Sequence, residues 1–174
     1  LNGMDGLSSI RMLKKVLKAI LTGFAAQFVQ IHDAAATALK RMIGEGIPYH
    51  LREQMIQQAM TYAEEEIYGD GGGHNGKETV APFVNQLIQT LETLLVNKYK
   101  SAWVHIVNVT KKLFETIRQN NGATVLLLSN LVSQLAQIYE SAETGAMQLD
   151  ASIHLVIGET LGIAIRSFGF ASFT

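Results

Sequence analysis

The sequence predicts an all-α protein built from antiparallel helical hairpins. Apolar residues recur at spacings of three and four in seven stretches of the chain, which is the pattern of amphipathic helices. Valine, isoleucine and threonine do not alternate with polar residues over any long run, so a sheet has little support. The two prolines, Pro48 and Pro82, both stand where a helix would begin.

Three of the predicted helices precede residue 69. The first covers residues 9–24, with Ser8 or Ser9 as its N-cap. The second is alanine-rich, begins at Asp33 and is ended by Gly44 and Gly46. The third covers residues 49–68, and its periodicity predicts one buried stripe: Leu51, Met55, Ile56, Ala59, Met60, Ala63 and Ile67.

Residues 69–77 interrupt the helical pattern and are predicted to form a flexible glycine-rich loop. Five of the residues 69–76 are glycine, and each costs a helix up to about 1 kcal/mol relative to alanine. Residues 71–77 also match the G-x-x-x-x-G-K spacing of a phosphate-binding loop. That motif requires Ser or Thr next, where this chain has Glu78, and a strand before it, where a helix is predicted. We therefore expect a solvated loop without bound nucleotide.

Four further helices are predicted after the loop. One covers residues 79–96, with Thr79 as its cap, and the next covers residues 101–119. A helix over residues 123–139 is apolar almost all round at its start, which predicts a buried inner helix. The last covers residues 149–168, with these residues facing inward: Ile153, Val156, Ile157, Leu161, Ala164 and Ile165.

The lengths of the helices and links favour a HEAT- or armadillo-like α-solenoid of about seven helices. Short links favour antiparallel neighbours, and hairpins of about 40 residues match the size of such repeats. A single globular helical bundle is the alternative. We interpret residues 1–174 as one helical-repeat segment of a longer solenoid, because apolar side chains crowd its end at Phe168, Phe170 and Phe173.

The composition excludes several classes of site. The net charge is −1, so any contact with RNA must come from a local patch. The absence of cysteine removes disulfides and thiolate zinc sites and fits a reducing compartment. The longest apolar run, residues 125–128, is far too short for a membrane span, so we expect a soluble chain with no membrane partner.

No catalytic, cofactor or metal site is predicted. No serine lies in a G-x-S-x-G elbow, and no acid–base pair has catalytic spacing. No two histidines have the spacing of a zinc peptidase, and each is expected to be an ordinary hydrogen-bonded surface residue. The five are His32, His50, His74, His105 and His154.

Two groups of basic residues are candidate contacts for RNA or an acidic partner. The first is a stripe at i, i+3, i+4 and i+7 on the first helix: Arg11, Lys14, Lys15 and Lys18. The second and weaker group lies around Tyr99: Lys98, Lys100, Lys111 and Lys112. Such a stripe could follow a phosphate backbone. An ordinary solvated helix face would carry similar charges, so that interpretation stays open.

The stretch from residue 94 to 103 reads LLVNKYKSAW and leads into an aliphatic helix that ends near Phe114. It resembles a signature of the ribosomal-RNA-processing-protein-twelve family of HEAT-repeat ribosome assembly factors, in which a Tyr-Lys-x-Ala-Trp turn joins two helices. Residues 157–166, IGETLGIAIR, resemble the family's next helix, which precedes a glycine, here Gly169. The resemblance is specific over residues 94–170. It departs from the family at Val104, where a proline is often seen.

The resemblance implies a non-catalytic scaffold in ribosome biogenesis, acting in rRNA processing and in assembly and export of ribosomal precursors. It implies a location in the nucleolus and nucleus, with protein partners and ribosomal RNA bound along the scaffold. It implies no cofactor and no small-molecule substrate. Two alternatives stay open: another HEAT-type scaffold, such as a nuclear transport receptor or adaptor, and a small all-helical enzyme with a site assembled across helices.

Tyr99 and Trp103 are predicted to be structural corner residues. A large ring at the first turn of a helix, just after a lysine–tyrosine pair, would wedge the corner between two hairpins. Burying such a ring contributes a few kcal/mol, on the order expected for a large aromatic side chain. A partner contact through Trp103 is the alternative, because aromatic residues are enriched in binding hot spots.

Overall fold

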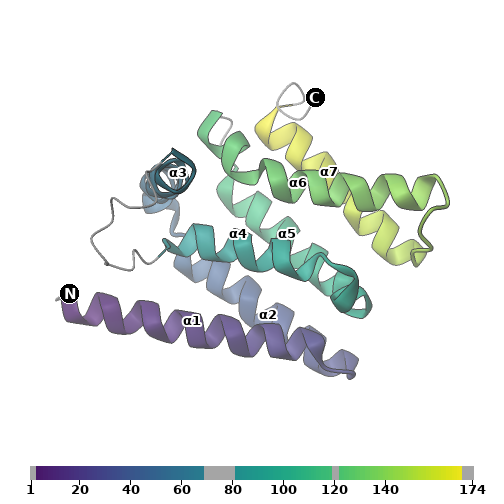
Figure 1. Cartoon of the computed structure of the whole chain (residues 1–174), viewed down its shortest axis with the longest axis horizontal. Helices are drawn as coiled ribbons and strands as arrows, with labels where there is room; N and C mark the ends of the chain where they lie inside the picture. The colour runs from purple at the N-terminus through teal and green to yellow at the C-terminus, as the bar shows by residue number, and fades with distance from the viewer. Residues whose placement is uncertain (1–2, 69–80, 119–121, 170–174) are drawn as a thin grey trace.

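The computed structural model describes residues 3–68, 81–118 and 122–169, and within these ranges it contains seven α-helices, two short 3₁₀ helices and no strand (Figure 1). The predicted loop at 69–77 and the predicted cap Thr79 lie outside the described residues. The elements are α1 (Gly3–Ala25), α2 (Val29–Gly46), η1 (Tyr49–Leu51), α3 (Arg52–Tyr68), α4 (Phe83–Leu94), η2 (Asn97–Ala102), α5 (Trp103–Ile117), α6 (Gly122–Glu143) and α7 (Ala151–Phe168).

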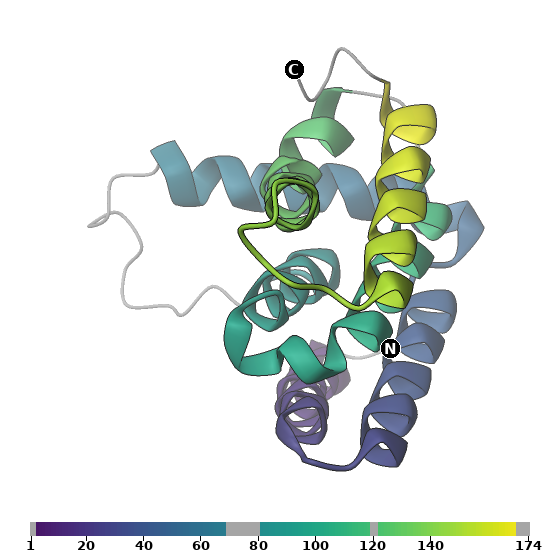
Figure 2. The ribbon, with the colours of Figure 1, turned by 90° about the vertical axis from the view of Figure 1, so that its right-hand side faces the viewer.

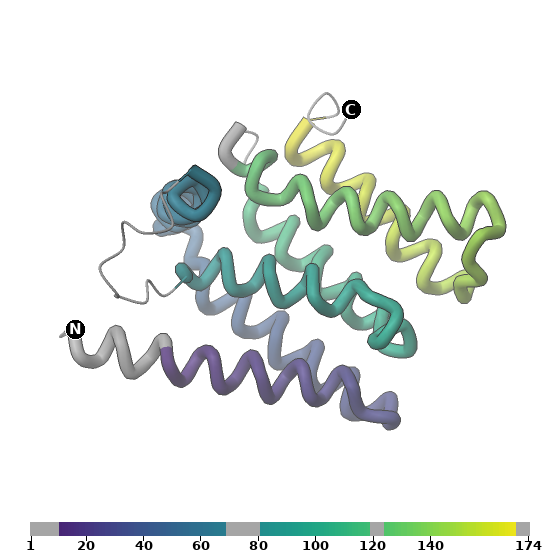
Figure 3. Tube along the Cα trace, viewed as in Figure 1, coloured from purple at the N-terminus to yellow at the C-terminus, as the bar shows by residue number. Residues whose placement is uncertain are grey.

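Six of the helices form two layers of a solenoid. Helices α1, α4 and α6 lie side by side in one layer, and α2, α5 and α7 lie side by side in the other (Figures 1 and 3). Consecutive helices pair across the layers as the hairpins α1/α2, α4/α5 and α6/α7. This arrangement confirms the predicted all-α solenoid.

Helix α3 belongs to neither layer. It crosses the solenoid and contacts α4 and α6, and Figure 2 shows it at a steep angle to the other helices, extending beyond the layer of α1, α4 and α6. The two ends of α3 therefore lie on different sides of the solenoid. The sequence pattern predicted a helix here but did not predict this crossing.

Several predicted helix ends are wrong. Helix α1 begins at Gly3, so Ser8 and Ser9 lie inside it, and Asp33 lies inside α2, whose N-cap is Phe28. Helix α2 includes both Gly44 and Gly46. The predicted ends rested on residue propensities alone. In the structure, packing between α1 and α2 extends both helices beyond those ends.

In the last two hairpins, the starts of α5 and α7 also differ from prediction. Helix α7 is capped by Asp150, whose carboxylate accepts a hydrogen bond from the Ser152 backbone N–H at 3.1 Å. Its last residue is Phe168, as predicted, and the following Gly169 has a φ of 92°, in the left-handed region that favours glycine. The predicted start of the fifth helix at Ser101 is instead part of η2.

Most of the residues that were predicted to face inward are buried. Four of them are exposed instead: Leu51, Ile67, Leu126 and Ile165. The exposed fraction of the Ile67 side chain is the largest of the four, at 72%. Ile67 is exposed because the C-terminal half of α3 extends past the helices that cover Ile56 and Ala59. Leu126 shows that α6 is not buried all round, because α6 has neighbours on only some of its sides.

Helix α7 meets the length and composition criteria of a membrane span, with a mean hydropathy of 1.2 over 18 residues. It is the one helix among the described residues that does so. Polar residues interrupt its apolar ones, so no unbroken apolar run marks this helix in the sequence. A third of this helix is buried (33%), where it packs on α5 and α6, and a core helix has the same composition.

Two glycines of α2 give a matched test of packing. A Cβ added to Gly46 would lie 2.5 Å from Cε1 of the Phe83 ring, whereas a Cβ on Gly44 would meet only the Lys112 side chain at 3.9 Å. We expect Gly46→Ala to lower the free energy of unfolding by about 1–3 kcal/mol through overpacking. Gly44→Ala should instead raise it by up to about 1 kcal/mol. Urea unfolding of both variants checks this, and equal changes in the two would contradict it.

Candidate partner-binding surface

The four residues of the basic stripe on α1 are exposed, but their side chains do not all face the same part of the protein. Arg11, Lys14, Lys15 and Lys18 all have exposed side chains. Lys14 and Lys18 line a cavity beside α4, and Arg11 and Lys15 are not among its lining residues. One edge of the stripe, Lys14 and Lys18, therefore faces other helices of this chain. The other edge, Arg11 and Lys15, is free to contact another molecule, and we call it the free edge.

The second basic group is divided between two elements. Lys98 is exposed and Lys100 half-buried on η2, and the Lys98 Nζ lies 5.5 Å from the centre of the Tyr99 ring. Lys111 and Lys112 lie on α5, in the layer formed by α2, α5 and α7. The structure therefore does not gather the eight predicted basic residues into one patch.

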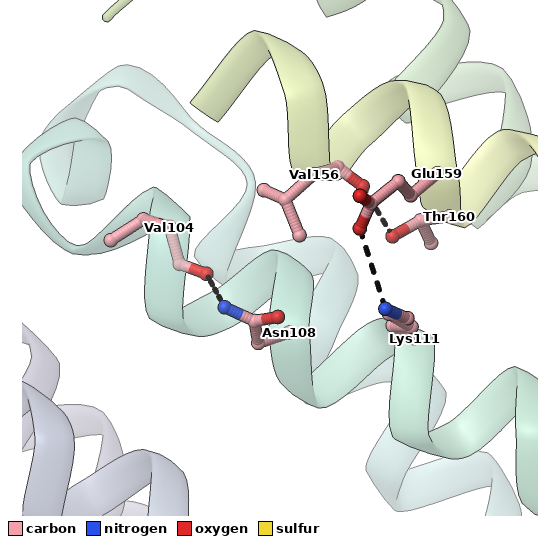
Figure 4. A network of polar contacts seen from close by, with 6 residues as sticks. All are labelled: Val104, Asn108, Lys111, Val156, Glu159 and Thr160. Carbon is pink, nitrogen blue, oxygen red and sulfur yellow. Dashed lines mark hydrogen bonds and ion pairs between the residues drawn. The ribbon is translucent and has the colours of Figure 1, made fainter. Parts of the chain in front are cut away.

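Lys111 is held by an ion pair that joins α5 to α7. Its Nζ lies 3.4 Å from Oε2 of Glu159 (Figure 4). Close by, the Asn108 side-chain N–H₂ donates to the Val104 carbonyl at 2.9 Å, and the Thr160 hydroxyl donates to the Val156 carbonyl at 2.7 Å. These two bonds keep the side chains on their own helices, so Lys111 and Glu159 supply the polar contact between helices in this view.

A groove crosses α4 at the base of the projecting half of α3. It consists of two adjoining cavities of about 410 Å³ and 340 Å³, which share Tyr62, Ala81 and Gln89. The larger lies between α3, α4 and α6, and the smaller lies between α1, α3 and α4. We call this feature the α4 groove. Cavities of this size accept side chains of a bound partner.

The α4 groove carries opposite charges in its two cavities. Lys14 and Lys18 line the smaller cavity, and Glu66 and Glu92 line the larger one. Burial raises the pKa of the Glu92 carboxyl above its ordinary value, and a hydrogen bond with Asn130 opposes that rise. Sequence reasoning did not find this groove, because it depends on where α3 crosses α4.

Trp103 and Tyr99 lie at the turn between α4 and α5. Trp103 is only 1% exposed, and its indole N–H donates to the carbonyl of Leu94, the last residue of α4, at 3.2 Å. Tyr99 is buried in η2. The Trp103 ring thus packs inside one hairpin, and it also lines a cavity with Gln134 and Ile138 of α6 in the next. It offers almost no free surface to a partner.

His32 is buried, unlike the surface position that we expected. It is 1% exposed, and its Nε2 lies 2.6 Å from the Ala26 carbonyl oxygen. Because a carbonyl only accepts, the Nε2 atom carries the proton and donates this bond. His32 therefore ties the start of α2 to the link after α1. His50 is exposed, and His74 lies outside the described residues.

His105 on α5 faces the start of α2. Its ring centre lies 6.3 Å from that of His32, and its Nδ1 lies 4.0 Å from the Asp33 carboxylate. Burial lowers the pKa of His105 below its ordinary value of 6.5; the Asp33 carboxylate opposes the shift, whereas His32 and Lys40 add to it. The folded protein therefore favours neutral His105.

This depressed pKa gives a pH dependence of stability. As pH falls, the unfolded chain protonates His105 before the folded chain does, so the free energy of unfolding should fall. The contribution is complete above the ordinary pKa of 6.5 and is lost as pH falls through the lowered folded pKa. Urea unfolding between neutral and mildly acidic pH should show a shallower pH slope in His105→Gln than in the unchanged chain. Identical slopes would contradict this account.

The remaining predicted motifs give no reactive cluster within the described residues. No group of three or more His, Asp or Glu side chains there has the arrangement of a metal site. His154 of α7 instead stacks on Tyr139 at 4.4 Å, with its Nε2 2.8 Å from Glu143. The phosphate-loop spacing at 71–77 lies outside the described residues, and the element before it is helix α3, not a strand.

The family model of ribosomal RNA-processing protein 12, HEAT repeats, matches residues 26–173. The match covers α2 to α7, so it extends well upstream of residues 94–170, over which the resemblance is specific. No curated protein and no solved structure matches the chain. The match spans far more than half of the sequence and agrees with the paired-helix architecture. This chain therefore belongs to the HEAT-repeat family of ribosomal RNA-processing protein 12.

Proposed function

We propose that this chain is a non-catalytic scaffold segment that acts in ribosomal RNA processing and in the assembly and export of ribosomal precursors. The single observation that carries the proposal is the family match over residues 26–173. The architecture supports it, since stacked hairpins present long helical surfaces to partners. We place the action in the nucleolus and nucleus, with proteins and ribosomal RNA as partners.

Depletion of the protein from the cells that produce it tests the role directly. Ribosomal RNA precursors should accumulate, and their level should return when the intact protein is supplied again. The measurement is hybridisation of total RNA with probes for precursor spacers. Unchanged precursor levels would overturn the proposal and would favour a transport receptor or adaptor of the same fold.

We propose that the free edge of the α1 stripe contacts RNA phosphates. Arg11→Glu combined with Lys15→Glu should weaken binding of poly(U) to the whole chain, and binding to the unchanged chain should weaken steeply with salt. Each lost phosphate contact should reduce the slope of log affinity against log salt by about 0.7. Fluorescence anisotropy across a salt series measures both effects.

A matched control for this prediction lies in the opposite layer of the solenoid. Arg41→Glu combined with Arg166→Glu changes the net charge equally, at exposed positions of α2 and α7. It should reduce poly(U) binding much less than the α1 variant does. Equal losses in the two variants would show that only net charge matters and that α1 has no specific role.

We also propose that the segment belongs to a longer solenoid. Large apolar side chains are exposed on the terminal helices, including Met12 at 66% on α1 and Leu155 at 65% on α7. Met12 and Val16 lie on nearly the opposite side of α1 from Lys14 and Lys18, so they face away from α4. Additional hairpins would cover them. An antibody against this segment should detect a polypeptide well above 19.0 kDa, and a band at that mass would refute the idea.

A further inference from the structure

The α4 groove lies on the layer formed by α1, α4 and α6, and residues of α1, α3, α4 and α6 line it. The half of α3 that projects from the layers (Figure 2) contributes Tyr62, Glu66 and Ile67 to its lining, and α4 contributes Ile88, Gln89 and Glu92. The two cavities meet at Tyr62 and Gln89, so the groove continues from α1 across α4 towards α6. A short segment of another chain could therefore occupy both cavities at once.

The charges in the α4 groove are not neutralised by one another. Within the described part of the chain, no ion pair involves Lys14, Lys18, Glu66 or Glu92. Glu66 accepts a hydrogen bond from the Tyr62 hydroxyl at 2.9 Å, which leaves its charge in place. The two cavities thus attract side chains of opposite sign.

Glu92 is the charge in the groove that would gain most from a partner. It is half-buried, and burial disfavours its charged form, as the raised pKa of this carboxyl records. A cation placed in the larger cavity would offset that loss of hydration. Such a cation should lower the pKa of Glu92.

Apolar side chains lie beside these charges. Ile88 and Leu127 line the larger cavity, and Ile67 lines it while being 72% exposed. Tyr68, the next residue, is 83% exposed. Exposed apolar side chains that adjoin one another mark a contact for another molecule more often than scattered single ones do.

We propose that the α4 groove binds a short segment of a partner protein that carries an acidic side chain towards Lys14 and Lys18, an apolar side chain in the middle and a basic side chain towards Glu66 and Glu92. This inference rests on the scaffold function proposed above and names the partner chemistry for one surface. RNA fits the groove poorly, because Glu66 and Glu92 would repel its phosphates.

The test uses short labelled peptides and the whole chain at low ionic strength. The mixed peptides carry an aspartate pair, a Leu-Phe centre and a lysine pair, in both orders. The comparison peptides keep the centre but carry aspartates or lysines at both ends. Fluorescence anisotropy should show one mixed peptide binding about tenfold more tightly than either comparison peptide, since two charge pairs replace one pair and one repulsion.

Charge variants assign the binding to the groove. Lys14→Glu combined with Lys18→Glu should move the preference to the all-lysine peptide, and Glu66→Lys combined with Glu92→Gln should move it to the all-aspartate peptide. The control variant, Arg41→Glu with Arg166→Glu, should leave the preference unchanged. In the complex, NMR titration should show a lower pKa for the Glu92 carboxyl than in the free chain.

Three results would overturn the inference. The first is that no peptide binds, and the second is that the all-aspartate or the all-lysine peptide binds as tightly as the mixed peptides. The third is that the control variant changes the preference as much as the groove variants do. None of these results depends on precursor RNA levels in cells, so failure of the groove and failure of the scaffold function are separable.

Discussion

Replacing Trp103 by alanine is expected to lower the free energy of unfolding by about 3–5 kcal/mol, the largest class of effect for a single buried residue. The side chain is among the largest that are fully buried, it lies at the turn between α4 and α5, and it lines a cavity together with residues of α6. The loss combines burial of the ring, the cavity left behind and the indole hydrogen bond to Leu94. Thermal unfolding should show a midpoint lower by about 2–4 °C per kcal/mol for a chain of this length.

Two comparisons make the Trp103 result interpretable. Trp103→Phe keeps most of the ring but leaves the Leu94 carbonyl without its partner, so a smaller loss of about 1–3 kcal/mol is expected. Tyr68→Ala removes an aromatic ring that is 83% exposed and should change stability by less than about 0.5 kcal/mol. A Trp103→Ala variant as stable as Tyr68→Ala would show that the turn does not depend on this ring.

Phe114→Ala is expected to have an effect of similar size, because Phe114 joins the second and third hairpins. It is fully buried on α5, and its ring meets that of Phe168 on α7 edge to face, with centres 5.7 Å apart and planes at 89°. Truncation should lower the free energy of unfolding by about 3–5 kcal/mol. Urea unfolding measures it, with Leu126→Ala as an exposed control expected to lose far less.

A double-mutant cycle isolates the contact between the two rings. Phe114→Leu and Phe168→Leu keep the positions apolar, so both variants should fold. The pair should show a coupling energy of about 0.5–1.5 kcal/mol, as expected for an edge-to-face aromatic pair. Additive effects would mean that the rings contribute only buried area and that α5 and α7 are not joined specifically at this point.

The basic stripe shows how far sequence reasoning reached towards a binding surface. Its spacing predicted a row of four cations on one helix, and all four are exposed on α1, although they do not all face the same way. The sequence did not show that Lys14 and Lys18 would stand in a groove with Glu66 and Glu92, which are far away along the chain. Charge patterns along one helix reveal a face, but they do not reveal which other charges lie opposite.

His32 and Ile67 show the same limit for burial. Both were assigned from local context, His32 to the surface and Ile67 to the interior, and both assignments are wrong. His32 is covered because the α1/α2 link folds back and presents the Ala26 carbonyl to it. Ile67 is uncovered because α3 extends past its neighbours (Figure 2).

Helical periodicity and the turn around Trp103 are local properties of the chain, so the seven helices, most of their inward faces and the HEAT-repeat family could be predicted from the sequence. The departure of α3 from the two layers, which creates the α4 groove, could not be predicted in this way. Periodicity specifies which side chains share a helix face. Which helix covers that face depends on contacts between residues distant in sequence, and no local pattern encodes them.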